Sequence, residues 1–304
     1  MLMRTTQKPN KILIYLDQNV LSETAKLGMN AKVRADFGVL FQLLHRAFLD
    51  GKLTTLRSIY HEAETSMAGS LKGSIRQRFA TLSHVHLKSP LRIKEAQIAR
   101  AAQLWLGLPD ATSVINYDDS FEDNPDGPLP IFDINIHMDW MFSNEAQDRE
   151  ALADKLDAVR LRERAECTTF QQLYKRELDW VRRNMASVVN APRLAAIAGI
   201  SIDEFCAFTN SREFGNIPCI HLDVALLAKL MTHYANRKIK SGDVSDLEAI
   251  AYYLPYCDAF ITDKSAASVA RAINVDQQYD CALFDASQSS VGALIEFLKL
   301  RLVL

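Results

Sequence analysis

Short apolar runs near the N-terminus alternate with segments in which apolar residues recur at helical spacing. Residues 12–16, Ile-Leu-Ile-Tyr-Leu, have the pattern of a buried strand, and 53–56 have that of a second strand. Between these runs, the apolar side chains from Lys32 to Leu49 are spaced as on one face of a helix, and Gly51 is placed to end it. Residues 57–82 are again helical in pattern.

The C-terminal part of the chain repeats this alternation. Apolar runs at 259–262 and 282–284 predict strands, and helical patterns follow each of them at 265–273 and 289–302. The resulting rhythm of strand and helix is typical of a parallel sheet flanked by helices, so the sequence predicts the α/β class.

The middle of the chain has a different character. An amphipathic helix is predicted for 92–107, two long charged helices for 144–189, and a shorter helix for 201–210. Residues 117–130 form an acidic segment rich in turn-forming residues. We therefore expect a helical insertion between the two strand-containing ends.

Carboxylates follow the strand-like runs at both ends of the chain. Asp17 comes directly after the first predicted strand, and Asp263 follows Ile261-Thr262. Asp246 is predicted to begin a helix, because Ser245 and Glu248 have the spacing of a capping box. Ligands of open α/β sheets bind at the carboxyl ends of strands, and clustered carboxylates there suit Mg²⁺ or Mn²⁺. These acids therefore predict a metal-dependent phosphodiesterase.

The order and setting of four acids resemble the PIN domain family of Mg²⁺/Mn²⁺-dependent ribonucleases. Asp17-Gln18-Asn19-Val20-Leu21 matches the family's opening motif, Asp-x-Asn-Val-Leu, after a strand. The second acid is matched by Glu64 in a helical segment, the third by Asp246 at a predicted helix start, and the fourth by Asp263 after a strand.

The resemblance implies a three-layer PIN-like fold with a central parallel sheet. Its nuclease domain would be split between residues 1–85 and 217–304, with 86–216 as the helical insertion. It also implies that Asp17, Glu64, Asp246 and Asp263 are the catalytic and metal-binding residues, that Mg²⁺ or Mn²⁺ is the cofactor, and that single-stranded RNA is the substrate.

Two of the four positions have alternatives nearby in the sequence. Glu62 lies in the same predicted helix as Glu64, and Asp258 precedes the strand that Asp263 follows. Asn19 is a plausible N-cap for the segment after the first strand, and Asp243 is a further acid near Asp246.

Four basic residues lie close to these acids in the sequence. Arg237, Lys238 and Lys240 directly precede the segment that contains Asp246, and Lys264 follows Asp263. Basic side chains bind backbone phosphate without regard to base sequence, so we assign these four as candidate substrate-binding residues.

Composition limits the classes of protein to which the chain can belong. The chain has 304 residues, of which 48% are hydrophobic and 24% charged, so it can build a substantial core. The formal net charge of −2 neither favours nor excludes nucleic acid, because a local basic patch is sufficient for binding. The five cysteines include no Cys-x-x-Cys pair, which is typical of buried thiols in a reducing compartment.

The sequence also leads to expectations about location and partners. It contains no apolar run long enough for a membrane span and no hydrophobic segment typical of a signal peptide, so we expect a cytoplasmic protein without a membrane partner. A homo-oligomer or a regulatory partner is compatible with the charged helices, and the resemblance allows a toxin, a defence effector or an RNA-processing enzyme.

Two other functions fit part of this sequence pattern. A haloacid dehalogenase-type phosphohydrolase also has an Asp after its first strand, but it needs a second Asp where this chain has Asn19. A catalytically inactive PIN-like module that serves as a scaffold is the remaining alternative.

Overall fold

The computed structural model of the protein describes residues 8–27, 29, 32–109, 111–122, 145–166, 168–233 and 238–302. Contacts within the chain divide it into two compact units. Lys8–Lys88 and Tyr256–Leu304 make up most of one, the sheet unit, which also includes residues 121–122. Ser89–Ser120 and Arg149–Pro255 make up most of the other, the helical unit.

The sheet unit contains all the strands of the described chain. These are β1 (Ile12–Leu16), β2 (Leu53–Arg57), β3 (Val85–His86), β4 (Ala259–Thr262) and β5 (Ala282–Asp285). They form one sheet in the order β3-β2-β1-β4-β5, and every neighbouring pair is parallel. The predicted α/β class with a parallel central sheet is therefore confirmed, whereas the finer PIN-like assignment stays a prediction.

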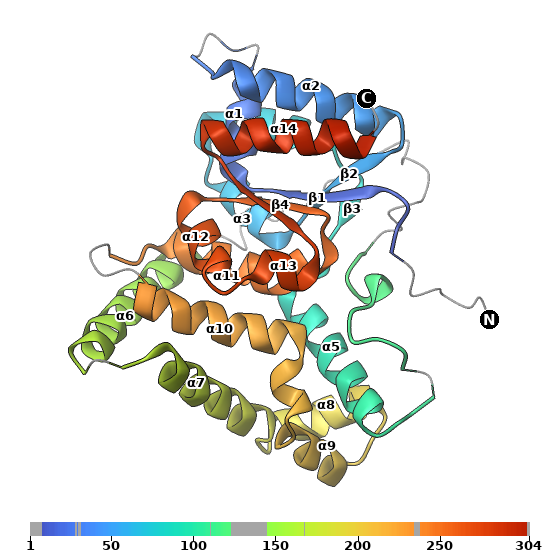
Figure 1. Cartoon of the computed structure of the whole chain (residues 1–304), viewed down its shortest axis with the longest axis vertical. Coiled ribbons are helices and arrows are strands. Elements are labelled where there is room, and N and C mark those ends of the chain that lie inside the picture. Colours follow the sequence, from blue (N-terminus) through green and yellow to red (C-terminus); the bar gives the residue numbers. More distant parts are fainter. Residues whose placement is uncertain are drawn as a thin grey trace. The chain divides into compact units, whose positions relative to one another are not determined.

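Helices cover both faces of this sheet, with α2 and α14 on one side and α12 and α13 on the other (Figure 1). The helices of the sheet unit are α1 (Gln18–Ala25), α2 (Ala35–Leu49), α3 (Ile59–Ser66), α4 (Lys72–Ala80), α12 (Lys264–Arg271), α13 (Val275–Tyr279) and α14 (Gln288–Leu302). Parallel strands buried on both faces need apolar side chains at almost every position, which explains the apolar runs of β1, β4 and β5 in the sequence.

The main core lies between the sheet and helices α1, α2, α4 and α14. Side chains from the strands, among them Ile14, Leu16 and Ile261, pack there against helical residues such as Leu40 and Leu294. All of these are buried. Burial of apolar surface, at about 25 cal/mol per Å², stabilises this side of the sheet.

Glycines interrupt the helical patterns of the sheet unit at two places, and the one at Gly51 was predicted. Helix α2 ends at Leu49, and Gly51 follows with a positive φ of 67°, a conformation that glycine adopts without strain. The helical pattern over 57–82 is interrupted by a 3₁₀ turn at Gly69–Leu71, where Gly69 also has a positive φ.

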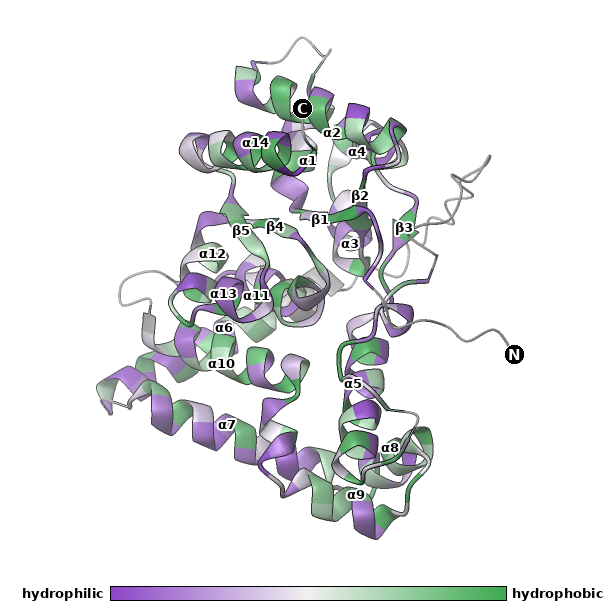
Figure 2. Cartoon of the chain, turned by 45° about the vertical axis from the view of Figure 1, so that its right-hand side comes forward, coloured by the Kyte–Doolittle hydropathy of each residue, from purple (hydrophilic) through white to green (hydrophobic). Residues whose placement is uncertain are grey.

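The helical unit contains helices α5, most of α6, and α7 to α11. Their bounds are α5 (Pro90–Trp105), α6 (Glu145–Ala165), α7 (Phe170–Met185), α8 (Asn190–Ala198), α9 (Ile202–Thr209), α10 (Pro218–His233) and α11 (Ser241–Tyr253). Within the unit, α10 packs against α7 and α11, and α5 packs against α8. Helix α7 is largely hydrophilic (Figure 2) but buries Leu173 and Val181, as expected of an amphipathic surface helix.

The contacts and the sequence prediction divide the chain differently over residues 217–255. The prediction joined this segment to the nuclease domain, whereas the contacts unite α10 and α11 with the other helices, because α10 packs on both α7 and α11. The predicted domain bounds, 1–85 with 217–304 and 86–216, stay a prediction. Among the described helices, none is both long and apolar enough to cross a membrane.

Candidate functional site

Asp17 is fixed at the carboxyl end of β1. Its backbone N–H donates to the Ile261 carbonyl at 3.0 Å, which continues the ladder between β1 and β4 beyond Leu16. Its side-chain Oδ1 accepts a hydrogen bond from the Asn19 backbone N–H at 2.7 Å, so Asp17 is the N-cap of α1. The prediction of Asn19 as the cap was wrong, because α1 begins directly after the strand.

Asp263 occupies the equivalent place after β4. Its Oδ1 accepts from the Ala266 backbone N–H at 2.6 Å and caps the N-terminus of α12. Its side chain is half-buried. Because β1 and β4 are parallel neighbours, Asp17 and Asp263 lie at the same edge of the sheet.

This edge is the topological switch point of the sheet. From β1 the chain continues to β2 and β3 on one side, and it later returns to β4 and β5 on the other side of β1. Ligands of open α/β sheets bind in the crevice outside the carboxyl ends of the two strands at which the order reverses. Asp17 and Asp263 follow those two strands.

The electrostatics of the pair disfavour two bare negative charges. Burial raises the pKa of Asp17 from 3.8 to about 6, the hydrogen bond from Asn19 opposes the rise, and the nearby Asp263 carboxylate adds to it. Only 6% of Asp17 is exposed, and its second carboxylate oxygen, Oδ2, has no hydrogen-bond partner within the described chain. A buried carboxylate oxygen without a donor is costly unless a cation or a proton meets it.

A divalent cation fits this pair by the chemistry of its donors. Mg²⁺ usually binds through one or two carboxylates and retains several water molecules. Asp17 and Asp263 supply two carboxylates, one of them with an unpartnered oxygen. Among the described residues, no three acidic, histidine or cysteine side chains are grouped closely enough to hold a metal ion by themselves. The structure therefore brings two of the predicted acids together but does not group Glu64 with them in this way.

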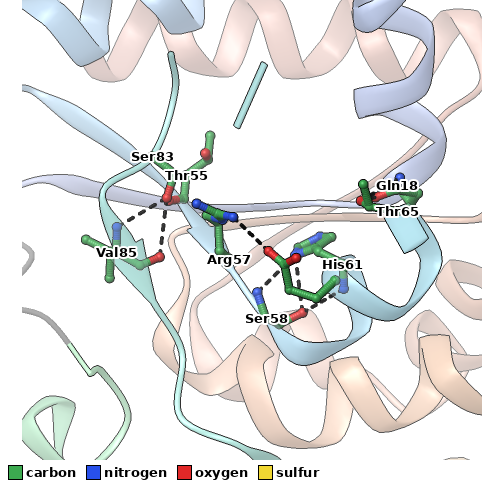
Figure 3. A network of polar contacts seen from close by, with 9 residues as sticks. Gln18, Thr55, Arg57, Ser58, His61, Thr65, Ser83 and Val85 are labelled. Atoms are coloured by element: carbon green, nitrogen blue, oxygen red, sulfur yellow. Dashed lines mark hydrogen bonds and ion pairs between the residues drawn. The ribbon is translucent and has the colours of Figure 1, made fainter. Parts of the chain in front are cut away.

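Glu64 lies on α3, a helix that is tied to the start of α1. Gln18, which follows Asp17, exchanges hydrogen bonds of 3.1 and 3.3 Å with the hydroxyl of Thr65, which follows Glu64 (Figure 3). Glu64 itself is half-buried. The link places the α3 backbone beside that of α1, within the same unit as Asp17.

Glu62 is engaged elsewhere on the same helix. Its Oε1 accepts from the Arg57 guanidinium at 2.7 Å, and the Arg57 side chain is almost fully buried. The guanidinium also lies over the Phe79 ring, 5.3 Å from its centroid. Of the two glutamates that the sequence left open, Glu62 therefore has a structural role as the counter-ion of a buried arginine.

Asp258 lies at the opposite end of β4 from Asp263. It precedes the strand, and its carboxylate accepts from the Leu13 backbone N–H at 2.9 Å and from the Lys8 ammonium at 2.6 Å. The two aspartates are five residues apart along extended chain, which spans about 16 Å. At the edge that contains Asp17, the acid from β4 is Asp263.

Sequence reasoning missed a third acid at this edge. Asp285 ends β5 and pairs in register with Thr262, the residue before Asp263. Burial works against ionisation of Asp285, but hydrogen bonds from Ser287 and the Arg271 guanidinium outweigh it and lower the pKa of this carboxyl. An acid directly after the run Ala282-Leu283-Phe284 is the same signal that identified Asp17 and Asp263.

Asp246 does not begin a helix, contrary to the prediction. Helix α11 starts at Ser241, one turn earlier, because the Asp243 side chain accepts from the Lys240 backbone N–H at 2.7 Å and closes the first turn there. Asp246 is therefore in the second turn, and Ser245 with Glu248 is not a capping box. Asp246 belongs to the helical unit, and its role as a metal ligand stays a prediction.

The predicted substrate-binding residues are distributed over both units. Lys264, in the sheet unit, is exposed beside Asp263 and forms no ion pair with another described residue. In the helical unit, Lys238 is paired with Asp154 at 2.8 Å, and the exposed Lys240 is the N-cap of α11. Arg237 lies outside the described residues.

Comparisons with protein-family models, with curated proteins and with solved structures found no match to this chain.

Proposed function

We propose that the chain is a Mg²⁺- or Mn²⁺-dependent endoribonuclease of the PIN-like type, with Asp17 and Asp263 at the centre of its site. One observation carries this proposal: the two aspartates follow the two strands of the switch point, and Asp17 has a buried, unpartnered carboxylate oxygen. A bound divalent cation would polarise the scissile phosphate and lower the pKa of a coordinated water.

In this proposal, different residues hold the cation and bind the backbone phosphate of the substrate. Asp17 and Asp263 hold negative charge at a fixed place, because each is tied to the first turn of the helix that follows it. Lys264 offers an exposed ammonium group beside Asp263, suited to a backbone phosphate. Glu64, Asp246, Lys238, Lys240 and Arg237 enter the proposal as sequence predictions, and the preference for single-stranded RNA rests on the family resemblance.

The test is a cleavage assay on the purified full chain. With Mg²⁺ or Mn²⁺ the protein should cut single-stranded RNA internally, and excess EDTA should stop the reaction. Duplex RNA and single-stranded DNA of the same sequence should be cut more slowly. Cleavage that persists in EDTA would refute the metal mechanism.

An inactive scaffold is the second candidate, and one observation favours it. Both Asp17 and Asp263 already cap helices, which is an ordinary structural role for an aspartate. Calorimetry with Mn²⁺ separates the two functions from one another. A scaffold of this type should neither bind Mn²⁺ through Asp17 nor cut RNA, whereas the nuclease should do both.

The two glutamates of α3 should respond differently to the same substitution. Glu64→Gln should greatly reduce cleavage, because it removes the second acid of the predicted set of four. Glu62→Gln should leave cleavage nearly normal but lower the free energy of unfolding by about 1–2 kcal/mol, since the buried Arg57 loses a charged acceptor. Cleavage rates and urea unfolding of both variants check this, and reversed activities would mean that Glu62 is the catalytic acid.

A further inference from the structure

His61 replaces a backbone hydrogen bond at the point where β1 and β2 end. In the parallel ladder, Ile12 pairs with Leu53, and the Ile12 N–H donates to the Lys52 carbonyl. If the hydrogen-bond pattern of this ladder continued in the same register, the Ser58 N–H would donate to the Leu16 carbonyl. Instead, the Ser58 N–H bonds to Nδ1 of the His61 imidazole (Figure 3). The Leu16 carbonyl bonds to Nε2 of the same ring.

The two bonds fix the tautomer of His61. The Ser58 backbone N–H can only donate, so Nδ1 of His61, at 3.1 Å, must be the acceptor. The proton is then on Nε2, which donates to the Leu16 carbonyl at 2.6 Å. Burial, the largest cause, lowers the pKa of His61 to about 3, so the ring is neutral at physiological pH.

Packing holds the ring in this position. It stacks on Tyr15 with centroids 4.6 Å apart and meets the edge of Phe79 at 4.8 Å. The Tyr15 hydroxyl lies 3.1 Å from the Ser58 hydroxyl, so Tyr15, Ser58 and His61 are all in mutual contact. His61 is 1% exposed, so no water competes for either nitrogen.

We propose that His61 is a positioning residue for the candidate site: its imidazole separates the ends of β1 and β2 and fixes the Leu16 carbonyl, and hence the peptide from which Asp17 projects. The inference rests on the proposed function for its catalytic meaning. The Leu16 carbonyl and the Asp17 nitrogen belong to one planar peptide, whose N–H bonds to Ile261. His61 and β4 therefore hold this peptide from both sides.

Two substitutions separate the two bonds of His61. In His61→Asn the side-chain oxygen takes the place of Nδ1 and accepts from Ser58, but the donor to Leu16 is lost. In His61→Gln the amide nitrogen reaches the position of Nε2 and keeps that donor. Phe79→Leu is the matched control, because it loosens the packing around His61 without removing either bond.

Metal binding in the absence of RNA is the first readout. Loss of an outer partner of a metal ligand typically weakens metal binding by roughly 10- to 100-fold. Mn²⁺ calorimetry should show this for His61→Asn, whereas His61→Gln and Phe79→Leu should bind nearly as the wild type does. A parallel loss in Phe79→Leu would mean that general loosening, and not the bond to Leu16, is responsible.

A second readout does not depend on metal. Asp17→Asn should raise the melting temperature of the EDTA-treated protein, because it removes a buried charge. If His61 fixes Asp17 in its buried place, this rise should be clearly smaller in the His61→Asn background and unchanged in the Phe79→Leu background. Equal rises in both backgrounds would overturn the inference, even if the protein cuts RNA. If the protein does not cut RNA but the rise in melting temperature is smaller only in the His61→Asn background, the nuclease function is refuted and the positioning role of His61 is supported.

Discussion

Asp17→Asn and Asp263→Asn should each abolish metal-dependent cleavage of single-stranded RNA while the protein stays folded. Asparagine keeps the shape and the helix-capping oxygen of aspartate but removes the charge that would hold the cation. Loss of a partner that only orients a ligand weakens metal sites by 10- to 100-fold, so loss of a ligand should lower kcat/KM by more than about 100-fold. Initial rates over a range of Mn²⁺ concentrations measure the effect.

Asp258→Asn is the matched control for this experiment. It makes the same chemical change on the same strand, but at the opposite end, where the carboxylate contacts Lys8 and the Leu13 backbone. Cleavage by this variant should be nearly normal at a temperature at which it remains folded. If Asp258→Asn loses activity and Asp263→Asn keeps it, the site lies at the opposite edge of the sheet, where the strands begin.

Asp17→Asn should also make the metal-free protein more stable at neutral pH. The pKa of Asp17 is higher in the folded protein, about 6, than its ordinary value of 3.8. The folded state therefore holds the proton more tightly, and the stability that this contributes is fully present below pH 3.8 and lost as the pH rises through 6. The difference between these two pKa values corresponds to about 3 kcal/mol of unfolding free energy. The wild type has lost this stability at pH 7.5, and the asparagine variant regains it.

Urea unfolding in EDTA at several pH values measures this difference. The gain from Asp17→Asn should be nearly absent around pH 4 and should grow to its full size above pH 6. Mn²⁺ should narrow the gap, since a ligand at ten times its dissociation constant stabilises the wild type by about 1.4 kcal/mol. A gain that does not depend on pH would mean that the carboxylate of Asp17 is not the cause.

Asp285→Asn provides a control of opposite sign at the same edge. The pKa of Asp285 is lowered in the folded protein, so its ionised form adds stability that is present above its ordinary pKa and lost as the pH falls through the folded value. This variant should be less stable than the wild type at neutral pH, and the difference should shrink in acid. The two variants together distinguish a carboxylate that lacks a partner from one already satisfied by Arg271 and Ser287.

Local chemistry in the sequence was sufficient to predict four of the five described strands, whereas β3 (Val85–His86) was missed. The apolar runs at 12–16, 259–262 and 282–284 became β1, β4 and β5, because a strand buried on both faces needs apolar residues at nearly every position. The segment 53–56, two leucines around two β-branched threonines, became β2. The same logic predicted Asp17 and Asp263 as strand-ending acids, since an ionisable side chain directly after such a run marks the point where the apolar strand ends. The positions of these two residues in the fold were thus readable from the chain alone.

Only the tertiary structure decided which acids lie at the same edge of the sheet and which already have hydrogen-bond or ion-pair partners. Asp258 and Asp263 flank one strand, and they are told apart by the hydrogen bonds of Asp258 at its far end. Glu62 is bound to Arg57, which the sequence prediction placed at the start of the helical segment 57–82 and which the structure places at the end of β2.

The start of α11 and the role of His61 also depend on contacts that no local pattern records. The sequence offered a capping box at Ser245, but the bond between Asp243 and Lys240 begins the helix a turn earlier, since a helix starts at the first cap whose hydrogen bonds form. His61 bonds to the Leu16 carbonyl, a partner 45 residues away that only the pairing of β1 with β2 brings within reach. Helix periodicity and turn chemistry act over a few residues, so they determined the elements, whereas the candidate site was determined by the order in which the strands pair.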